Sequence, residues 1–271
     1  MDQHALKELL EFYDAAGVDA SLGNAPVDRF AVVKEPPSAK LAAAPLPAEP
    51  PTQQPDPPHV HNPEQALATQ DGLAQAQALA TQAQTLEELH AALAGFDGCS
   101  LKKTARNLVF ADGNPQANIM LIGEAPGREE DAQGLPFVGR SGQLLDKMLG
   151  AIGLDRTKVY IGNVIYWRPP GNRTPTPQER AICEPFIRRQ IELCAPKVMM
   201  TLGGSALSCL FGINGIMKTR GQVLPYEHGD LSLPCVPTLH PAALLRNPIN
   251  KRLAWHDLLA LQALIEEHKA Q

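Results

Sequence analysis

Residues 119–127 have the sequence IMLIGEAPG, in which four consecutive apolar residues run directly into a turn rich in glycine and proline. A short apolar run that ends in turn residues is typical of a strand buried on both faces of a sheet. Three further runs have the same character, at 159–165, 198–202 and 236–239. The sequence therefore predicts four buried strands.

Helical patterns separate these strands, near 142–152, 177–194 and 205–211, and a final one extends from about 251 to 268. Apolar strands that alternate with helices indicate a parallel sheet covered by helices on both faces. We therefore predict an α/β protein, with a three-layer α/β/α domain built on a central four-stranded parallel sheet.

The amino-terminal third has a different composition, because 11 of the 25 prolines lie between Pro26 and Pro63. Proline has no amide hydrogen to donate, and this stretch carries too little apolar mass to offset the entropy of ordering it. We predict a disordered Pro/Ala-rich region ahead of the folded domain. The expected segments are an amphipathic helix at 1–16, a disordered Pro-rich linker at 17–64, a helical Ala/Gln-rich lead-in at 65–95 and the α/β domain at 96–271.

Charge is distributed as unevenly as proline. The chain has 24 basic and 29 acidic residues, a net charge of -5, but residues 1–95 contain 4 basic and 13 acidic residues, which gives -9. Residues 96–271 therefore carry +4. An acidic total argues against a nucleic-acid partner, because phosphate binding needs a positive field. Counted by segment, however, the charge of the folded domain is positive, so the charge does not argue against a nucleic-acid partner for this domain.

No targeting segment is evident in the sequence. The first twenty residues lack the apolar core of a signal peptide, and the apolar run at 198–213 is too short to cross a membrane. The five cysteines are odd in number and scattered, which does not indicate a disulfide framework. We expect a monomeric cytoplasmic protein that does not contact a membrane.

Polar side chains lie at or just beyond the carboxyl ends of three of the predicted strands. Glu124 lies in the glycine-rich loop after the first strand, Asn163 lies within the second, and His240 comes directly after the fourth. Ligands of parallel α/β sheets bind at the carboxyl ends of the strands, so these side chains mark the expected site. The loop at 123–127 has neither the Gly-Lys-Ser/Thr of a P-loop nor the spacing of a dinucleotide-binding turn, which argues against a nucleotide cofactor.

Three ordered motifs carry a family resemblance: GEAPGREEDAQGLPFVGRSGQLLDKML at 123–149, NVIYWRPPGNRTPTPQE at 163–179 and HPAALLRNP at 240–248. The chain from about 99 to 267 resembles the family 4 uracil-DNA glycosylases. The resemblance implies a monofunctional DNA-repair enzyme of base excision, which flips uracil out of DNA and hydrolyses its N-glycosidic bond. Its partner would be uracil-containing DNA, and its products would be an abasic site and free uracil.

The resemblance also implies roles for individual residues. His240 would donate a hydrogen bond to uracil O2, and Glu124 would position or activate the attacking water and stabilise the sugar cation. It assigns uracil binding to Gly123, Glu130, Phe137 and Asn163. Of these, Phe137 would stack on the flipped base, Asn163 would pair with its O4 and N3–H, and Glu130 would exclude the C5 methyl of thymine.

DNA contacts are expected from two segments that flank the site. Leu244 or Leu245 would wedge into the gap left by the flipped base, and Arg246 would contact a phosphate. Arg168 and Arg173 would contact phosphates from the other side. Unstacking a base costs a few kcal/mol, which a wedge and phosphate contacts can offset.

The chain departs from the family at its metal site. Family 4 members usually hold a [4Fe-4S] cluster on four cysteines, but here Phe96 and Trp167 occupy two of those positions, and only Cys99 and Cys183 remain. Two thiolates cannot hold a four-iron cluster, and the spacing of the other three cysteines suggests no replacement. We expect no metal and no cofactor, with a hydrophobic plug in the volume of the cluster.

Two alternatives remain open at this point. One is a non-catalytic or covalently trapping uracil-DNA binding protein of the same fold. The other is a glycosylase of altered base preference, acting on hypoxanthine or on mismatched G:T or G:U pairs. The helix at 1–16 either packs back on its own domain or binds a replication or repair protein. The sequence does not distinguish single-strand from double-strand preference.

Overall fold

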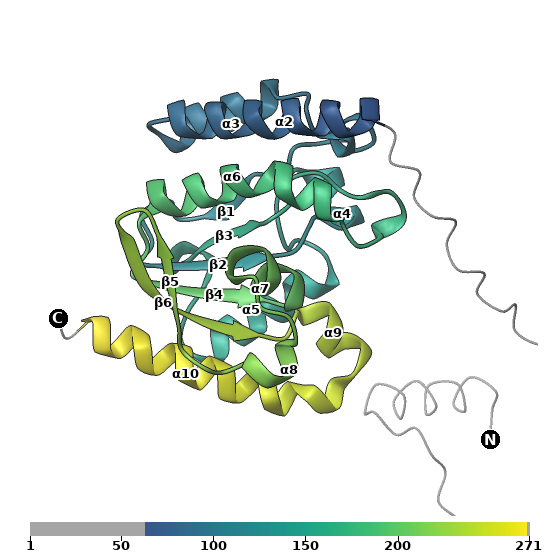
Figure 1. The fold of residues 1–271 in the computed structure, drawn as a ribbon. Coiled ribbons are helices and arrows are strands. Elements are labelled where there is room, and N and C mark those ends of the chain that lie inside the picture. The colour runs from purple at the N-terminus through teal and green to yellow at the C-terminus, as the bar shows by residue number, and fades with distance from the viewer. Residues whose placement is uncertain (1–62, 270–271) are drawn as a thin grey trace, which may run out of the picture. The chain divides into compact units, whose positions relative to one another are not determined.

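The computed structural model describes residues 63–269, in which one sheet is covered by helices on both faces (Figure 1). The strand order is β1-β3-β2-β4-β6-β5. The four central strands β3, β2, β4 and β6 are parallel, which confirms the predicted α/β class and its four parallel strands. The strands are β1 (Ala111–Gly113), β2 (Ile119–Gly123), β3 (Tyr160–Asn163), β4 (Val198–Leu202), β5 (Leu224–His228) and β6 (Leu231–Thr238).

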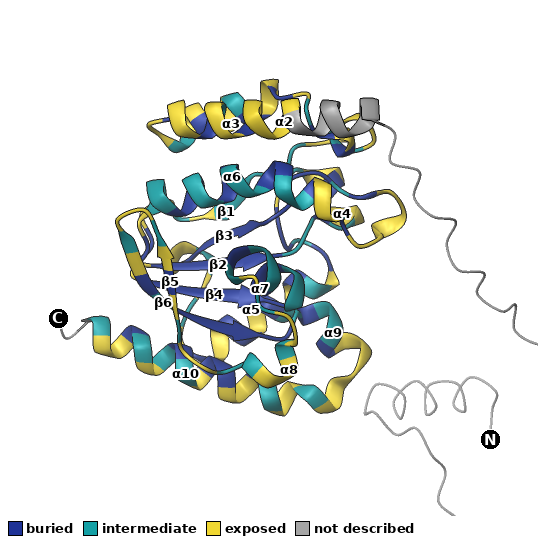
Figure 2. Cartoon of the chain, in the orientation of Figure 1, coloured by how far each residue is buried: buried dark blue, intermediate teal, exposed yellow. Residues whose placement is uncertain are grey.

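Two edge strands were not predicted. β1 pairs antiparallel with β3, and β5 pairs antiparallel with β6. β1 has only three residues, and β5 alternates exposed and buried positions, so neither contains the continuous apolar run that marks a strand buried on both faces. By contrast, every residue of β2, β3 and β4 is buried, as Figure 2 shows.

Helices form a layer on each face of the sheet. On one face lie α6 (Pro177–Cys194) and α7 (Gly204–Phe211), which share a hydrophobic core with β2 and β3. On the other lie α5 (Arg140–Ala151), α9 (Pro241–Arg246) and α10 (Lys251–Lys269). These layers match the predicted α/β/α arrangement (Figure 1).

The helices α2 (Pro63–Gln82) and α3 (Leu86–Gly95) lie against α6 and belong to the same compact unit as the sheet. The small side chains Ala76 and Ala80 of α2 are buried in the shared core, as are Leu89 and Leu93 of α3. Thr85 caps α3 by accepting a hydrogen bond from the amide of Glu88. The structure thus joins the predicted lead-in at 65–95 to the α/β domain.

The remaining elements are short. They are α4 (Arg128–Gln133), α8 (Ile216–Thr219) and the 3-10 helices Ser100–Lys103, Arg156–Lys158, Pro170–Asn172 and Pro248–Asn250. The predicted helix at 1–16 and nearly all of the predicted linker at 17–64 lie outside the described residues. The last two positions of the predicted linker, 63 and 64, form the start of α2 instead. No helix within 63–269 has the length and apolar character needed to cross a membrane.

Candidate active site

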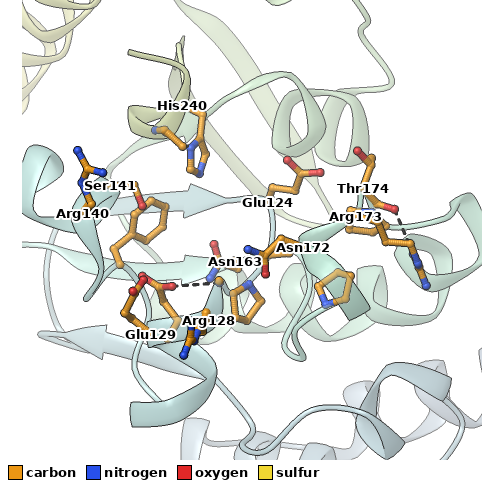
Figure 3. A pocket seen from close by; sticks show the side chains of 18 of the residues that line it. Glu124, Arg128, Glu129, Arg140, Ser141, Asn163, Asn172, Arg173, Thr174 and His240 are labelled. Carbon is orange, nitrogen blue, oxygen red and sulfur yellow. Dashed lines mark hydrogen bonds between the residues drawn. The ribbon is translucent and has the colours of Figure 1, made fainter. Parts of the chain in front are cut away.

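A cavity of about 780 Å³ opens where β2, β3 and β6 end. Glu124 directly follows β2, Asn163 is the last residue of β3, and His240 lies two residues beyond β6. Figure 3 shows these three side chains around a common space. The structure therefore brings together three predicted residues that lie far apart in the sequence, at the sheet edge where ligands of this fold class bind.

Asn163 is 1 % exposed, and its Oδ1 atom has no hydrogen-bond partner among the described residues. Gly123 explains how the amide fits at this place. A Cβ atom at Gly123 would lie 2.5 Å from Oδ1 of Asn163 and 2.5 Å from Cζ of Phe137, so any other residue would displace both side chains. An unpaired buried acceptor costs about 1–3 kcal/mol, which a ligand with a matching donor would recover.

Phe137 forms an aromatic wall of the cavity together with His240. Its side chain is 3 % exposed, and the two ring centroids lie 5.6 Å apart with an angle of 29° between the ring planes. Phe137 therefore supplies an aromatic, apolar surface to the cavity. Such a surface suits a planar ligand.

His240 is the N-cap of α9, and its Nδ1 atom accepts a hydrogen bond of 3.1 Å from the amide of Ala242. Burial, together with the nearby positive charge of Arg246, lowers the pKa of His240 to about 4. The imidazole is therefore neutral near pH 7. Because Nδ1 is the acceptor, the single ring proton resides on Nε2, and the residue presents an N–H donor.

Glu124 is partly buried on the opposite side of the cavity from His240 (Figure 3). Within 63–269, no hydrogen bond or ion pair engages its carboxylate. Its backbone is held to the end of β3, because its carbonyl oxygen accepts a hydrogen bond of 3.0 Å from the amide of Ile165. A fixed backbone with a free carboxylate suits a group that binds a water or a cation.

Glu130 also lines the cavity, but both of its oxygens are engaged. Oε2 accepts from the amide of Gly127 at 3.1 Å, and Oε1 accepts from the amide of Gly139 at 2.9 Å. The carboxylate thus ties together the two loops that border the cavity. Its predicted role against a methyl group stays a prediction.

Two of the three arginines predicted from the sequence line the cavity. They are Arg173, which is held by two hydrogen bonds of 2.8 and 2.6 Å to Glu179, and Arg246. Arg168 is not a lining residue, and its Nε donates to Oδ1 of Asn172 at 2.6 Å.

The sequence analysis missed two further arginines of the cavity, Arg128 and Arg140. They are the first residues of α4 and α5. A positive charge is unfavourable at a helix N-terminus, and this placement is a signal that could have identified them.

The structure corrects one predicted contact. Leu244 is 1 % exposed and lies in the core formed with α5 and α10, so it cannot reach a ligand in the cavity. Leu245 is 37 % exposed and lines the cavity. Of the two predicted wedge residues, only Leu245 has the required exposure.

Away from the cavity, Cys99 and Cys183 are both fully buried, and the side-chain hydrogen bond with Cys183 lowers the pKa of Cys99. Phe96 and Trp167 are 1 % and 2 % exposed and lie in the same hydrophobic core. Phe96 packs on Phe186 with a centroid distance of 5.3 Å. Within the described part of the chain, no three His, Cys, Asp or Glu side chains are grouped to hold a metal ion.

Comparison with known proteins matches residues 110–259 to the family model of the uracil DNA glycosylase superfamily. A type-4 uracil-DNA glycosylase of Thermotoga maritima is 42 % identical over 175 residues, which cover 62 % of this chain and 88 % of that protein. A type-4 enzyme of Archaeoglobus fulgidus is 43 % identical over 155 residues, 55 % of this chain and 78 % of the relative. A type-5 uracil-DNA glycosylase of Thermus thermophilus is 31 % identical over 132 residues, which cover 43 % of this chain and 58 % of that protein.

We predict that His240 titrates with a midpoint of about 4, and that Arg246→Met raises this midpoint by removing a nearby cation. NMR titration of selectively labelled histidine measures both values. Because the folded pKa lies below that of the unfolded chain, the unfolded chain binds more protons. The stabilisation from His240 is complete above about pH 6.5 and declines as the pH falls toward the folded pKa. A midpoint near the ordinary value in the native protein would show that neither burial nor Arg246 lowers the pKa of His240.

Proposed function

The chain belongs to the uracil-DNA glycosylase superfamily, and from this premise we propose that its cavity receives a uracil flipped out of DNA and that the protein hydrolyses the N-glycosidic bond. The products are an abasic site and free uracil, as in base excision repair. One observation carries the assignment to uracil: the buried, unpaired Oδ1 atom of Asn163 at the cavity.

Asn163 matches the hydrogen-bonding edge of uracil. Its Oδ1 accepts from uracil N3–H, while its amide nitrogen donates to O4. Cytosine presents an acceptor at N3 and a donor at C4, so the same amide would face two mismatched groups. The ring of Phe137, which lines the cavity, stacks on the planar base. The pocket thus distinguishes uracil from cytosine by the polar atoms that cytosine would leave unpaired.

His240 and Glu124 supply the chemistry of bond cleavage. As the bond between the sugar and uracil N1 breaks, negative charge develops on the base and positive charge on the sugar. The Nε2–H of a neutral His240 donates to uracil O2 and stabilises the leaving anion. The free carboxylate of Glu124 stabilises the sugar cation and orients the water whose oxygen bonds to the sugar carbon. The water proton leaves through Glu124 or through solvent.

DNA is held by positive charge around the mouth of the cavity. Arginines reach it from α4, α5, the loop before α6 and the end of α9, namely Arg128, Arg140, Arg173 and Arg246. Phosphates carry no base information, so these contacts position the strand and make affinity depend on salt. Leu245, exposed on α9, occupies the gap that the flipped base leaves in the stack.

Both catalytic groups are present together, which favours hydrolysis over binding alone. A protein that only trapped uracil DNA would need no free carboxylate facing a neutral imidazole. The pairing of Asn163 with uracil favours uracil over other bases. Excision rates on oligonucleotides with hypoxanthine and with mismatched G:T and G:U pairs, measured beside the rate on uracil, test for an altered base preference.

The residues at the cluster position of family 4 do not fit an iron–sulfur cluster. Phenyl and indole groups are not iron ligands, and the two remaining thiols are fully buried in the same hydrophobic core. We propose that Phe96 and Trp167 fill the volume of the cluster and that the protein acts without it.

We predict that the protein removes uracil from a single-stranded oligonucleotide and that Glu124→Ala and His240→Ala each lower the single-turnover rate by about 100- to 1000-fold. Each variant removes one electrostatic contribution to the transition state and leaves the core intact. Alkaline cleavage of the abasic product measures the rate, and Glu227→Ala is the control, a carboxylate on β5 away from the cavity. Near-wild-type rates for both variants would disprove the mechanism.

Asn163→Leu separates recognition from stability. Leucine has the same branching and the same number of side-chain heavy atoms as asparagine but no polar atoms, so the unpaired buried oxygen disappears, which offsets the cost of the bulkier methyl groups. We expect the free energy of unfolding in urea to stay unchanged or to rise by up to about 3 kcal/mol, while uracil excision falls by about 100-fold or more. A variant that is both less stable and still active on uracil would show that Asn163 has a structural role.

Protein purified without oxygen is predicted to contain no stoichiometric iron and to lack the broad visible absorbance of an iron–sulfur cluster. The Cys99→Ala/Cys183→Ala variant should keep its uracil excision, because neither thiol lines the cavity. Iron analysis and activity are measured on the same samples. Brown protein that loses iron and activity together in the double variant would overturn the assignment.

A further inference from the structure

Phe137 has a backbone conformation that its side chain does not favour. Its φ angle is 55°, in the left-handed region that residues with a side chain rarely adopt. Only two other described non-glycine residues have positive φ, Asn172 and Ala195. Such a conformation persists only where its surroundings hold it. The ring that forms the aromatic wall of the cavity therefore depends on contacts made elsewhere.

Arg156 supplies these contacts. It begins the 3-10 helix Arg156–Lys158, and its Nη2 donates to the carbonyl oxygen of Phe137 while its Nη1 donates to that of Pro136 at 3.2 Å. The φ angle of Phe137 is the torsion between the carbonyl carbons of these two residues. One guanidinium bonded to both carbonyl oxygens restrains that torsion directly.

The guanidinium is itself held on two other sides. Its Nη1 contacts Oδ2 of Asp112 in β1 at 2.5 Å, and its Nε donates to Oδ1 of Asp146 in α5 at 2.8 Å. Five donors in one rigid plane allow arginine to bond two carboxylates and two carbonyls at once. A lysine ammonium in the same place cannot reproduce this arrangement.

The carbonyl of Phe137 has no space on the side of α5. A Cβ atom at Gly142, in the first turn of that helix, would lie 1.6 Å from this oxygen. The backbone of Phe137 is thus confined between Arg156 and the helix. Arg156 does not line the cavity, whereas the ring of Phe137 does.

We propose that Arg156 is a positioning residue for uracil recognition, which holds Phe137 in its left-handed conformation so that the ring stacks on the base. This inference rests on the proposed function. Without Arg156 the backbone relaxes toward negative φ and the ring leaves the aromatic wall. The effect falls on binding of the base, because stacking acts equally on bound uracil and on the transition state.

Arg156→Met tests the proposal in the full-length protein. We expect KM for uracil DNA and the inhibition constant of free uracil each to rise by about 5- to 100-fold, the effect of removing base stacking on an aromatic ring, with a smaller change in kcat. Arg188→Met is the matched control. Arg188 also pairs with a carboxylate, Glu184, and a carbonyl, Leu210, with its side chain 20 % exposed against 25 % for Arg156. It differs in that none of its partners is a residue that lines the cavity.

Two further variants keep the test decisive. Arg156→Lys retains a cation between Asp112 and Asp146, so it guards against failure to fold, and it should also weaken inhibition by uracil. In a Phe137→Ala background, Arg156→Met should have no further effect on that inhibition, because both changes remove the same stacking contact.

The outcomes distinguish the two proposals. If the wild-type protein neither excises uracil nor is inhibited by it, the proposed function fails. If the wild type does both, the inference about Arg156 fails in either of two cases: Arg156→Met and Arg188→Met change the inhibition constant equally, or Arg156→Met still weakens inhibition after Phe137 has been removed.

Discussion

Parallel alignment of the central strands is the constraint on which the site depends. Because β3, β2, β4 and β6 run in the same direction, the residues that follow them converge at one edge of the sheet. β4 nevertheless separates β2 from β6, so His240 can approach the loop of Glu124 only across the end of β4. Gly203 follows β4 with φ 98°, and a Cβ atom there would lie 2.9 Å from the Cβ atom of His240. Because glycine has no side chain, Gly203 leaves room for His240 across the end of β4.

The sequence predicted the features of the fold and of the site that short local patterns encode. Apolar runs marked the four buried strands, and the polar residues at their ends marked the cavity. It could not choose between Leu244 and Leu245, because the burial of each depends on how the short helix α9 is rotated against α5 and α10. Arg156 escaped notice for a similar reason, since its partners come from β1, from the loop before α5 and from α5 itself. Such contacts are made by tertiary packing and leave no periodic signal.

The proposed replacement of cluster ligands by aromatic residues has a simple physical basis. A cluster on four cysteines ties distant segments together through metal bonds, and buried aromatic surface can do the same through packing. Trp167 is 2 % exposed and directly precedes the loop that carries Arg173 into the cavity, while Phe96 joins the end of α3 to α6 through Phe186. Complete burial of a large aromatic side chain is worth about 1.5–3 kcal/mol. Packing of Phe96 and Trp167 can therefore connect the segments that a metal cluster would otherwise connect.

Three features of the cavity are unfavourable to folding. Asn163 has a buried oxygen without a partner, Phe137 has a strained backbone, and His240 is held neutral by burial. Each feature is unfavourable in the free protein, and in the proposed complex each becomes favourable because the uracil supplies a donor, a stacking face and a developing negative charge. Since these groups are already in place, binding would require little reorganisation, and the hydrogen bond from His240 would strengthen as charge develops in the transition state. The two hydrophobic cores, one on each face of the sheet, hold these side chains in place. The stability of the fold is thereby linked to the chemistry at the edge of the sheet.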